Sequence, residues 1–185
     1  MKKIVSFLPF YNFHESYFYK DLWMIWYTFS QEKKFTSEVW ALREWKKNDF
    51  VVKGQKWIWF KNRFQIYCEL FKKAKDIDVL HIMHISVYTL LTVIIFRLKN
   101  TNWIIFLKMD SPLYETNPWV LIKDKRLKIR FIPFFIRNFL FKKINYFWFE
   151  DKELQQFYKD NYSNYADKFI FTTNWCYTWL NLKLN

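Results

Sequence analysis

The segment DIDVLHIMHISVYTLLTVIIFRLKNTNWIIFLKMD, residues 76–110, decides the fold. Its first part, residues 77–84, has the composition of a central, buried strand. An apolar stretch of helical length follows up to Leu98, and residues 103–108 return to a strand-like pattern. Strand, helix and strand at this spacing predict a βαβ unit, in which the two strands are parallel and the crossover is right-handed.

Further elements are expected on both sides of this unit. Alternating or compact apolar runs predict strands at residues 3–10, 36–42, 56–60, 144–149 and 168–173. Helical spacing predicts helices at residues 17–29, 64–75 and 123–143, the last bent at Pro133, and a short helix that Asp151 caps. The sequence therefore predicts one α/β domain with a Rossmann-like, doubly wound and mostly parallel sheet. It covers residues 1–175, and residues 176–185 form a tail or the start of an interdomain link.

The composition restricts the class of protein and its partners. The chain has 185 residues, of which 52% are hydrophobic and 24% aromatic, which excludes a disordered chain. Its net charge of +13 predicts attraction to phosphates, nucleic acid or anionic lipid, although translation of AT-rich DNA also enriches a protein in lysine. Cys68 and Cys176 lie far apart in no metal-binding pattern, so we expect no metal and a reducing, cytoplasmic location. The longest apolar run, residues 85–96, is too short to cross a bilayer.

The scarcity of glycine excludes several chemistries. Gly54 is the single glycine of the chain, and the GxGxxG, GxxxxGK and GxSxG patterns do not occur. A diphosphate is bound by backbone N–H groups in a tight, glycine-containing turn, where a side chain would hold the phosphate away. We therefore expect no cofactor in this chain and no complete nucleotide-dependent reaction by the chain alone.

The predicted sheet indicates where a ligand would bind. In a doubly wound sheet ligands bind at the carboxyl ends of the strands. The side chains that follow or end the predicted strands are Tyr11, Asn12, His14, His81, His84, Lys108, Asp110, Glu150 and Asn174. We expect these side chains to converge on one edge of the sheet.

Several strings, in order, resemble the GT-B-fold glycosyltransferases of the family 4 type, over nearly the whole chain. DIDVLHIMHIS is similar to a strand of that family that ends in Asp-Val-hydrophobic-His with a second His beyond, and WIIFLKMDSP is similar to the next strand. INYFWFEDKEL corresponds to a strand that closes in a Glu-bearing turn. DKFIFTTNW lies where the family has a strand, Pro-Asn-Gly and the link to its second domain. Here that site reads Thr173-Asn174-Trp175.

The resemblance implies that the chain is the acceptor-side half of a GT-B fold. In that case His84 and Asp110 would be the catalytic residues. The other strand-end side chains would bind a sugar or glycolipid acceptor. A nucleotide sugar would be the donor substrate only with a second domain. The Glu-x7-Glu pair of the donor-binding half is absent, because no two glutamates are eight positions apart. We therefore expect an incomplete, truncated or split glycosyltransferase of polysaccharide biosynthesis, inactive alone and dependent on a donor-binding partner subunit.

Each candidate also has a purely structural interpretation. His81 lies inside an apolar strand, where a buried histidine with a backbone partner is common. Asp110 precedes Ser111-Pro112, where a carboxylate often caps a turn. Glu150 would be favoured beside the positive end of the following helix.

The basic, aromatic segment 123–143 has three interpretations. It is an ordinary surface helix, a helix at an anionic membrane surface, or a nucleic-acid face, which we rank last because no recognition motif accompanies it. The proposed membrane contacts are Arg126, Arg130, Arg137, Lys142 and Lys143. They would make the protein peripheral on the inner face of the cell membrane. The alternative to a glycosyltransferase is accordingly a non-catalytic basic protein that binds a membrane surface or an anionic polymer.

Overall fold

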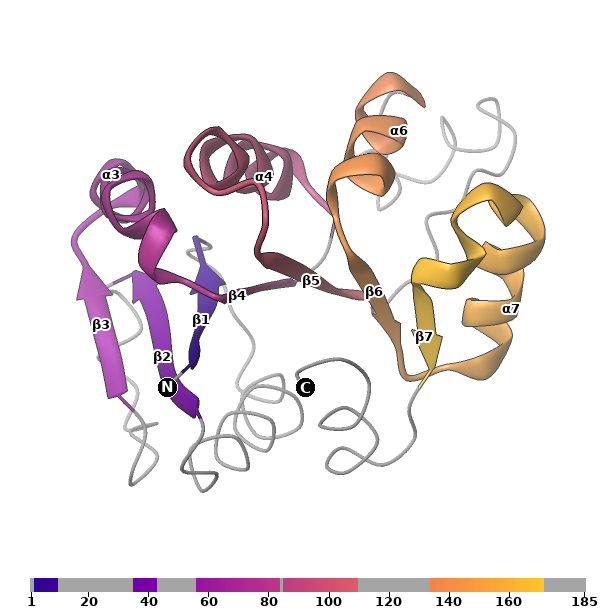
Figure 1. Ribbon diagram of the computed structural model, residues 1–185, viewed down its shortest axis with the longest axis horizontal. Coiled ribbons are helices and arrows are strands. Elements are labelled where there is room, and N and C mark those ends of the chain that lie inside the picture. Colours follow the sequence, from indigo (N-terminus) through magenta and orange to yellow (C-terminus); the bar gives the residue numbers. More distant parts are fainter. Residues whose placement is uncertain (1, 10–34, 43–55, 84, 110–133, 172–185) are drawn as a thin grey trace, which may run out of the picture.

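A computed structural model describes residues 2–9, 35–42, 56–83, 85–109 and 134–171 of the chain. Its strands, coloured along the chain in Figure 1, are β1 (Lys2–Leu8), β2 (Phe35–Leu42), β3 (Lys56–Phe60), β4 (Val79–Met83), β5 (Ile104–Met109), β6 (Tyr146–Phe149) and β7 (Phe169–Phe171). Its helices are α3 (Arg63–Lys73), α4 (Val87–Lys99), α6 (Phe134–Lys143) and α7 (Lys152–Asn161), with short 3-10 turns η3 (Ala74–Asp76) and η4 (Ser163–Lys168).

The seven strands form one parallel sheet in the order β3-β2-β1-β4-β5-β6-β7. The chain builds outward from β1 to β3, returns to the centre at β4 and then builds outward in the other direction. This is the strand order of a Rossmann-like, doubly wound fold, and it places the topological switch point between β1 and β4. The predicted fold class is confirmed, and each described strand overlaps the segment in which the sequence predicts it.

Helices α3, α4 and α6 lie side by side on one face of the sheet, and α7 lies beside β7 (Figure 1). The sheet side chains on this face belong to the larger core, in which Val5, Leu80 and Leu107 are fully buried with Phe96 of α4 and Leu140 of α6. Side chains on the opposite face form a second buried cluster around Leu8, Val39, Met83, Phe106 and Trp148. Both faces of the central strands are therefore buried, as their continuous apolar composition predicts.

Local sequence signals fix where the helices begin. The side chains of Asn62 and Ser86 accept hydrogen bonds from the backbone N–H groups of Gln65 and Thr89, at the starts of α3 and α4. Asp151 caps α7 in the same way, as the sequence predicts. Such caps satisfy N–H groups that have no partner inside the helix.

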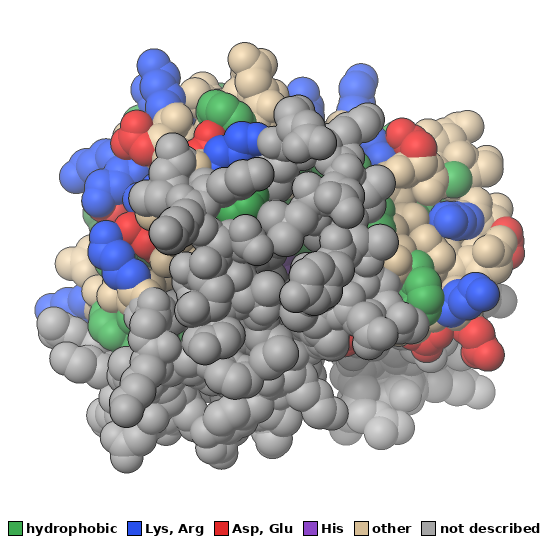
Figure 2. Space-filling model, turned by 60° about the horizontal axis from the view of Figure 1, so that its bottom comes forward, with side chains coloured by type: hydrophobic (Ala, Val, Ile, Leu, Met, Phe, Trp, Pro, Cys, Tyr) green, Lys and Arg blue, Asp and Glu red, His purple; other side chains and the backbone are tan. Residues whose placement is uncertain are grey.

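The basic residues do not form one uniform positive surface. On the side shown in Figure 2, Lys and Arg side chains gather most densely toward the end of the sheet formed by β3 and α3, with acidic side chains among them. One acid is buried in this region. Glu38 of β2 is 6% exposed and binds Lys3 of β1 (2.9 Å) and Lys56 of β3 (2.6 Å). This carboxylate therefore links three neighbouring strands.

Candidate functional site

A buried pair of polar side chains joins the two strands at the switch point. Ser6 of β1 and His81 of β4 are register partners, and Ser6 Oγ lies 3.0 Å from His81 Nδ1. Both side chains are buried, and the imidazole ring packs against Phe106 of β5 at a centroid distance of 5.9 Å. The pair links β1 to β4, the two strands that flank the switch point, within the buried part of the sheet.

An ion pair between a buried lysine and a partly exposed glutamate lies nearer the carboxyl edge of the sheet. Lys108 of β5 is opposite Met83, the last residue of β4, and opposite Trp148 of β6. Its side chain is fully buried, and its Nζ lies 3.2 Å from Oε2 of Glu150, which follows β6. The ammonium also lies over the Trp148 ring, 5.1 Å from the centroid. A lysine is seldom buried without such a partner, because desolvation of a charge is costly.

Glu150 is the member of this pair that solvent reaches. Its side chain is 39% exposed, whereas that of Lys108 is fully buried. The lysine therefore holds a partly exposed carboxylate just beyond the end of β6. A carboxylate accepts hydrogen bonds from hydroxyl groups, so the arrangement suits a ligand rich in hydroxyls.

Three of the side chains that the sequence singled out lie in the described residues. The structure brings Lys108 and Glu150 into contact, as expected of neighbouring strand ends. His81 is the third of five residues of β4 and is 2% exposed, which matches the interpretation of a buried histidine inside an apolar strand, and its Nδ1 lies 3.0 Å from the Ser6 hydroxyl group. Sequence reasoning missed Ser6, although a serine inside the apolar run of β1 was the available signal. Tyr11, Asn12, His14, His84, Asp110 and Asn174 lie outside the described residues.

Some of the proposed membrane contacts also lie outside the described residues, and the others lie within them. Arg126 and Arg130 lie outside the described residues, whereas Lys142 and Lys143 are exposed at the end of α6. Arg137 has a different place from the one expected, because its side chain is 7% exposed and packs over the Tyr162 ring, 4.8 Å from the centroid. It is therefore a packing residue between α6 and the segment after α7. Burial raises the pKa of Tyr162, against the opposing effect of Arg137.

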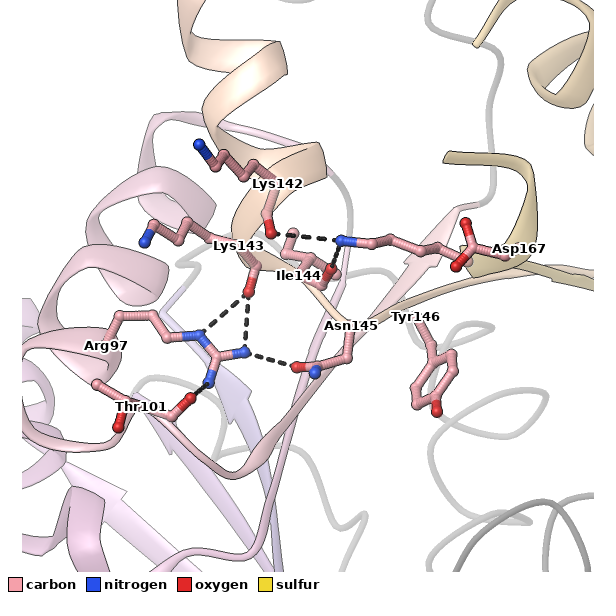
Figure 3. Close-up of a pocket in the computed structure, with 9 residues that line it drawn as sticks. Arg97, Thr101, Lys142, Lys143, Ile144, Asn145, Tyr146 and Asp167 are labelled. Carbon is pink, nitrogen blue, oxygen red and sulfur yellow. Dashed lines mark hydrogen bonds between the residues drawn. The ribbon is translucent and has the colours of Figure 1, made fainter. Parts of the chain in front are cut away.

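A cavity of about 500 Å³ lies at the opposite edge of the sheet, where β5 and β6 begin (Figure 3). Figure 3 shows the guanidinium of Arg97 between the ends of α4 and α6. It donates to the carbonyl oxygens of Lys143 (2.8 Å), Trp103 (2.7 Å) and Thr101 (3.3 Å) and to the side chain of Asn145. Lys143 is the last residue of α6, and Arg97 donates to its carbonyl oxygen, which has no partner inside the helix.

A second cation completes this helix end. Nζ of Lys168 donates to the carbonyl oxygens of Phe141 (2.8 Å) and Ile144 (2.9 Å). Burial lowers the pKa of Arg97. Burial also lowers the pKa of Lys168, and repulsion from Arg97 lowers it further. Both cations therefore donate hydrogen bonds to backbone carbonyl groups. We interpret the residues around this cavity as structural, because these contacts hold the helix ends and strand starts together. Among the described residues, no group of three His, Cys, Asp or Glu side chains is placed to hold a metal ion.

No protein-family model matches the sequence, and no curated protein is significantly similar to it. Solved structures nevertheless share its fold. The UDP-GlcNAc 2-epimerase of Neisseria meningitidis, solved with UDP-GlcNAc, is 13% identical with a TM-score of 0.60, over 93% of this chain and 46% of that chain. S. aureus MnaA, solved with UDP, is 12% identical with a TM-score of 0.56, over 93% of this chain and 44% of that one.

These likenesses define the class of domain. At such low identity they show the fold alone, which is a GT-B-like Rossmann domain. The chain spans less than half the length of either of these two proteins.

Proposed function

We propose that the chain is the acceptor-side half of a nucleotide-sugar glycosyltransferase, which transfers a sugar to a polysaccharide or glycolipid acceptor. Two facts about its structural neighbours support this proposal. Both were solved with a uridine nucleotide or nucleotide sugar, and the chain corresponds to less than half of each. The resemblance of its strand ends to the family 4 type favours glycosyl transfer.

The observation that carries the proposal is the Lys108–Glu150 pair at the carboxyl edge of the sheet. A sugar acceptor carries hydroxyl groups, which donate hydrogen bonds to carboxylates, and the Glu150 side chain is 39% exposed at this edge. The buried Lys108 ammonium keeps that carboxylate in place. In this proposal His84 and Asp110 would complete the site as the base and the positioning carboxylate.

The donor requires a second half in this proposal, in a partner subunit or in another segment of sequence. With Gly54 as its one glycine, the chain lacks the turn that holds a diphosphate. We therefore expect the purified chain to bind common UDP-, GDP- and CMP-sugars more weakly than a dissociation constant of about 100 μM, which is roughly 5.5 kcal/mol. Isothermal titration calorimetry measures this directly. Tighter binding of any of these nucleotide sugars would show that the chain itself holds the donor.

Acceptor binding tests the other part of the proposal. Saturation-transfer NMR with a panel of oligosaccharides and soluble glycolipids identifies a bound acceptor, whose affinity is then titrated. We expect Lys108→Met and Glu150→Gln each to weaken that acceptor at least tenfold, because either change removes the ion pair that positions the carboxylate.

Two variants on α7 are the matched controls. Lys152→Met and Glu153→Gln make the same changes in charge at exposed positions close in sequence, and should leave acceptor affinity within twofold. If none of the sugars binds, or if the site variants bind as well as the controls, the carboxyl edge is not an acceptor site.

A further inference from the structure

Helix α4 carries an apolar face that the core does not use. Four of its side chains recur at intervals of four, three and four residues, so they lie on one side of the helix, and each is between 37% and 74% exposed. We call Val87, Leu91, Ile94 and Leu98 the α4 stripe. Buried side chains of the same helix include Val93 and Phe96, which belong to the core. One apolar side of α4 packs against the core. The other side, the α4 stripe, needs a second apolar surface to pack against.

The neighbouring helix widens this surface. Phe64 and Phe71 of α3 are 77% and 43% exposed, and they lie seven residues apart on their helix. Nζ of Lys99, at the end of α4, lies 4.4 Å from the centroid of the Phe71 ring, which places the two helix ends in contact. Figure 1 shows α3 and α4 side by side on the same face of the sheet. The exposed apolar side chains thus form one surface over two helices.

The charge of these helices is predominantly positive. Helices α3, α4 and α6 together contain eight lysines and arginines, and Glu69 is the one acidic residue among them. By contrast, α7 has two basic and two acidic residues. Each of the three basic helices connects parallel strands, so their carboxyl ends lie at the same edge of the sheet. Cations occupy those last turns. Lys73 pairs with Glu69 (2.6 Å) and Arg97 binds backbone carbonyl groups, whereas the exposed lysines are Lys72, Lys99, Lys142 and Lys143.

We infer that this outer surface of α3 and α4 binds an anionic lipid membrane, with the α4 stripe in the headgroup boundary and the exposed lysines at the helix ends against lipid phosphates. Apolar side chains beside a row of lysines and arginines are the pattern of a helix that lies in the membrane interface. The described part of the chain has no helix that is long and apolar enough to cross a membrane. This surface lies apart from the Lys108–Glu150 pair, and the inference does not depend on the proposed function.

The membrane surface differs from the one that the sequence predicts. The alternation of cations and aromatics predicts that segment 123–143 contacts the membrane, yet Arg137 is buried in the structure. The α4 stripe contains no charged residue, so a pattern of basic residues in the sequence does not indicate it. Lys142 and Lys143 are common to both surfaces, because the end of α6 lies at the same sheet edge as the ends of α3 and α4.

Vesicle sedimentation with the full 185-residue chain tests the inference. We expect the chain to bind vesicles that contain phosphatidylglycerol and to bind pure phosphatidylcholine vesicles much more weakly. Val87→Ser combined with Leu98→Ser should reduce the bound-to-free ratio at least tenfold, because both side chains lose the apolar area that enters the lipid. Circular dichroism should show an unchanged fold, since both positions are exposed.

The matched control for the apolar changes is Phe157→Ser on α7, which removes an apolar side chain that is 40% exposed and lies outside the stripe. For the charges, Lys99→Gln, Lys142→Gln and Lys143→Gln together should also reduce binding at least tenfold. Lys152→Gln with Lys159→Gln on α7 should not. Binding that is equal on neutral vesicles, or equal in the stripe and control variants, would overturn the inference.

A second copy of the chain is the other conceivable occupant of the stripe. Sedimentation velocity without lipid separates the two cases. If the chain forms a dimer that Val87→Ser with Leu98→Ser abolishes, and ignores anionic vesicles, the stripe is a protein interface and the membrane assignment is wrong.

Discussion

Replacement of Arg97 by alanine is expected to lower the free energy of unfolding by about 3 kcal/mol, since hydrogen bonds from a charged donor contribute roughly 1.5–3 kcal/mol each and this side chain makes several. The guanidinium connects the end of α4 to the last carbonyl of α6 and to the start of β5. Its loss leaves those carbonyl oxygens without a donor. Urea unfolding followed by circular dichroism measures the change.

Two further variants, Arg97→Lys and Lys99→Ala, show whether the effect comes from the guanidinium contacts. Arg97→Lys should recover less than half of the lost stability, because an ammonium cannot reproduce the planar fork that reaches Lys143 and Trp103 together. Lys99→Ala, an exposed position on the same helix, should change the free energy of unfolding by less than about 0.5 kcal/mol. If Arg97→Ala unfolds like Lys99→Ala, the guanidinium contacts contribute nothing to stability.

The second large effect concerns Glu38 and depends on pH. Burial raises the pKa of this carboxyl group, but hydrogen bonds from Lys56, Trp40 and Lys3 outweigh burial and lower it from 4.5 to about 2. A lowered pKa stabilises the folded state above the pKa of the unfolded chain, and that stabilisation disappears as the pH falls toward the folded pKa. We expect Glu38→Gln to be less stable than the wild type by about 3 kcal/mol at neutral pH.

The pH dependence of the difference is the decisive measurement. The gap between wild type and Glu38→Gln should stay constant above about pH 5 and shrink steadily between pH 4.5 and pH 2. In that range the carboxyl group takes up a proton in the unfolded chain, whereas in the folded protein it does so only near pH 2. Urea unfolding at a series of pH values gives both curves. Glu153→Gln, at an exposed position on α7, should follow the wild-type curve throughout. A gap that does not change between pH 5 and pH 2 would contradict the lowered pKa of Glu38.

The candidate site shows which parts of a site can be predicted from sequence. Lys108 and Glu150 follow from strand periodicity, since parallel strands end at the same edge and therefore bring their last side chains together. The Ser6–His81 pair does not follow, because it depends on the register of β4 against β1, two strands separated by more than seventy residues. A shift of one residue would turn His81 to the other face of the sheet.

Periodicity and composition by themselves determined the order of the strands and helices that the structure describes, the parallel βαβ arrangement and the absence of a glycine-rich phosphate turn. These are local properties, because alternation and helical spacing depend on neighbouring residues alone. Tertiary packing decided which charges are buried and which apolar side chains are exposed. Arg137 and Lys108 carry charged side chains, which usually lie at the surface, but both are buried. Val87 and Leu98 carry apolar side chains, which usually lie in the core, but both are exposed. Burial depends on which elements pack together, and in this chain those elements come from distant parts of the sequence.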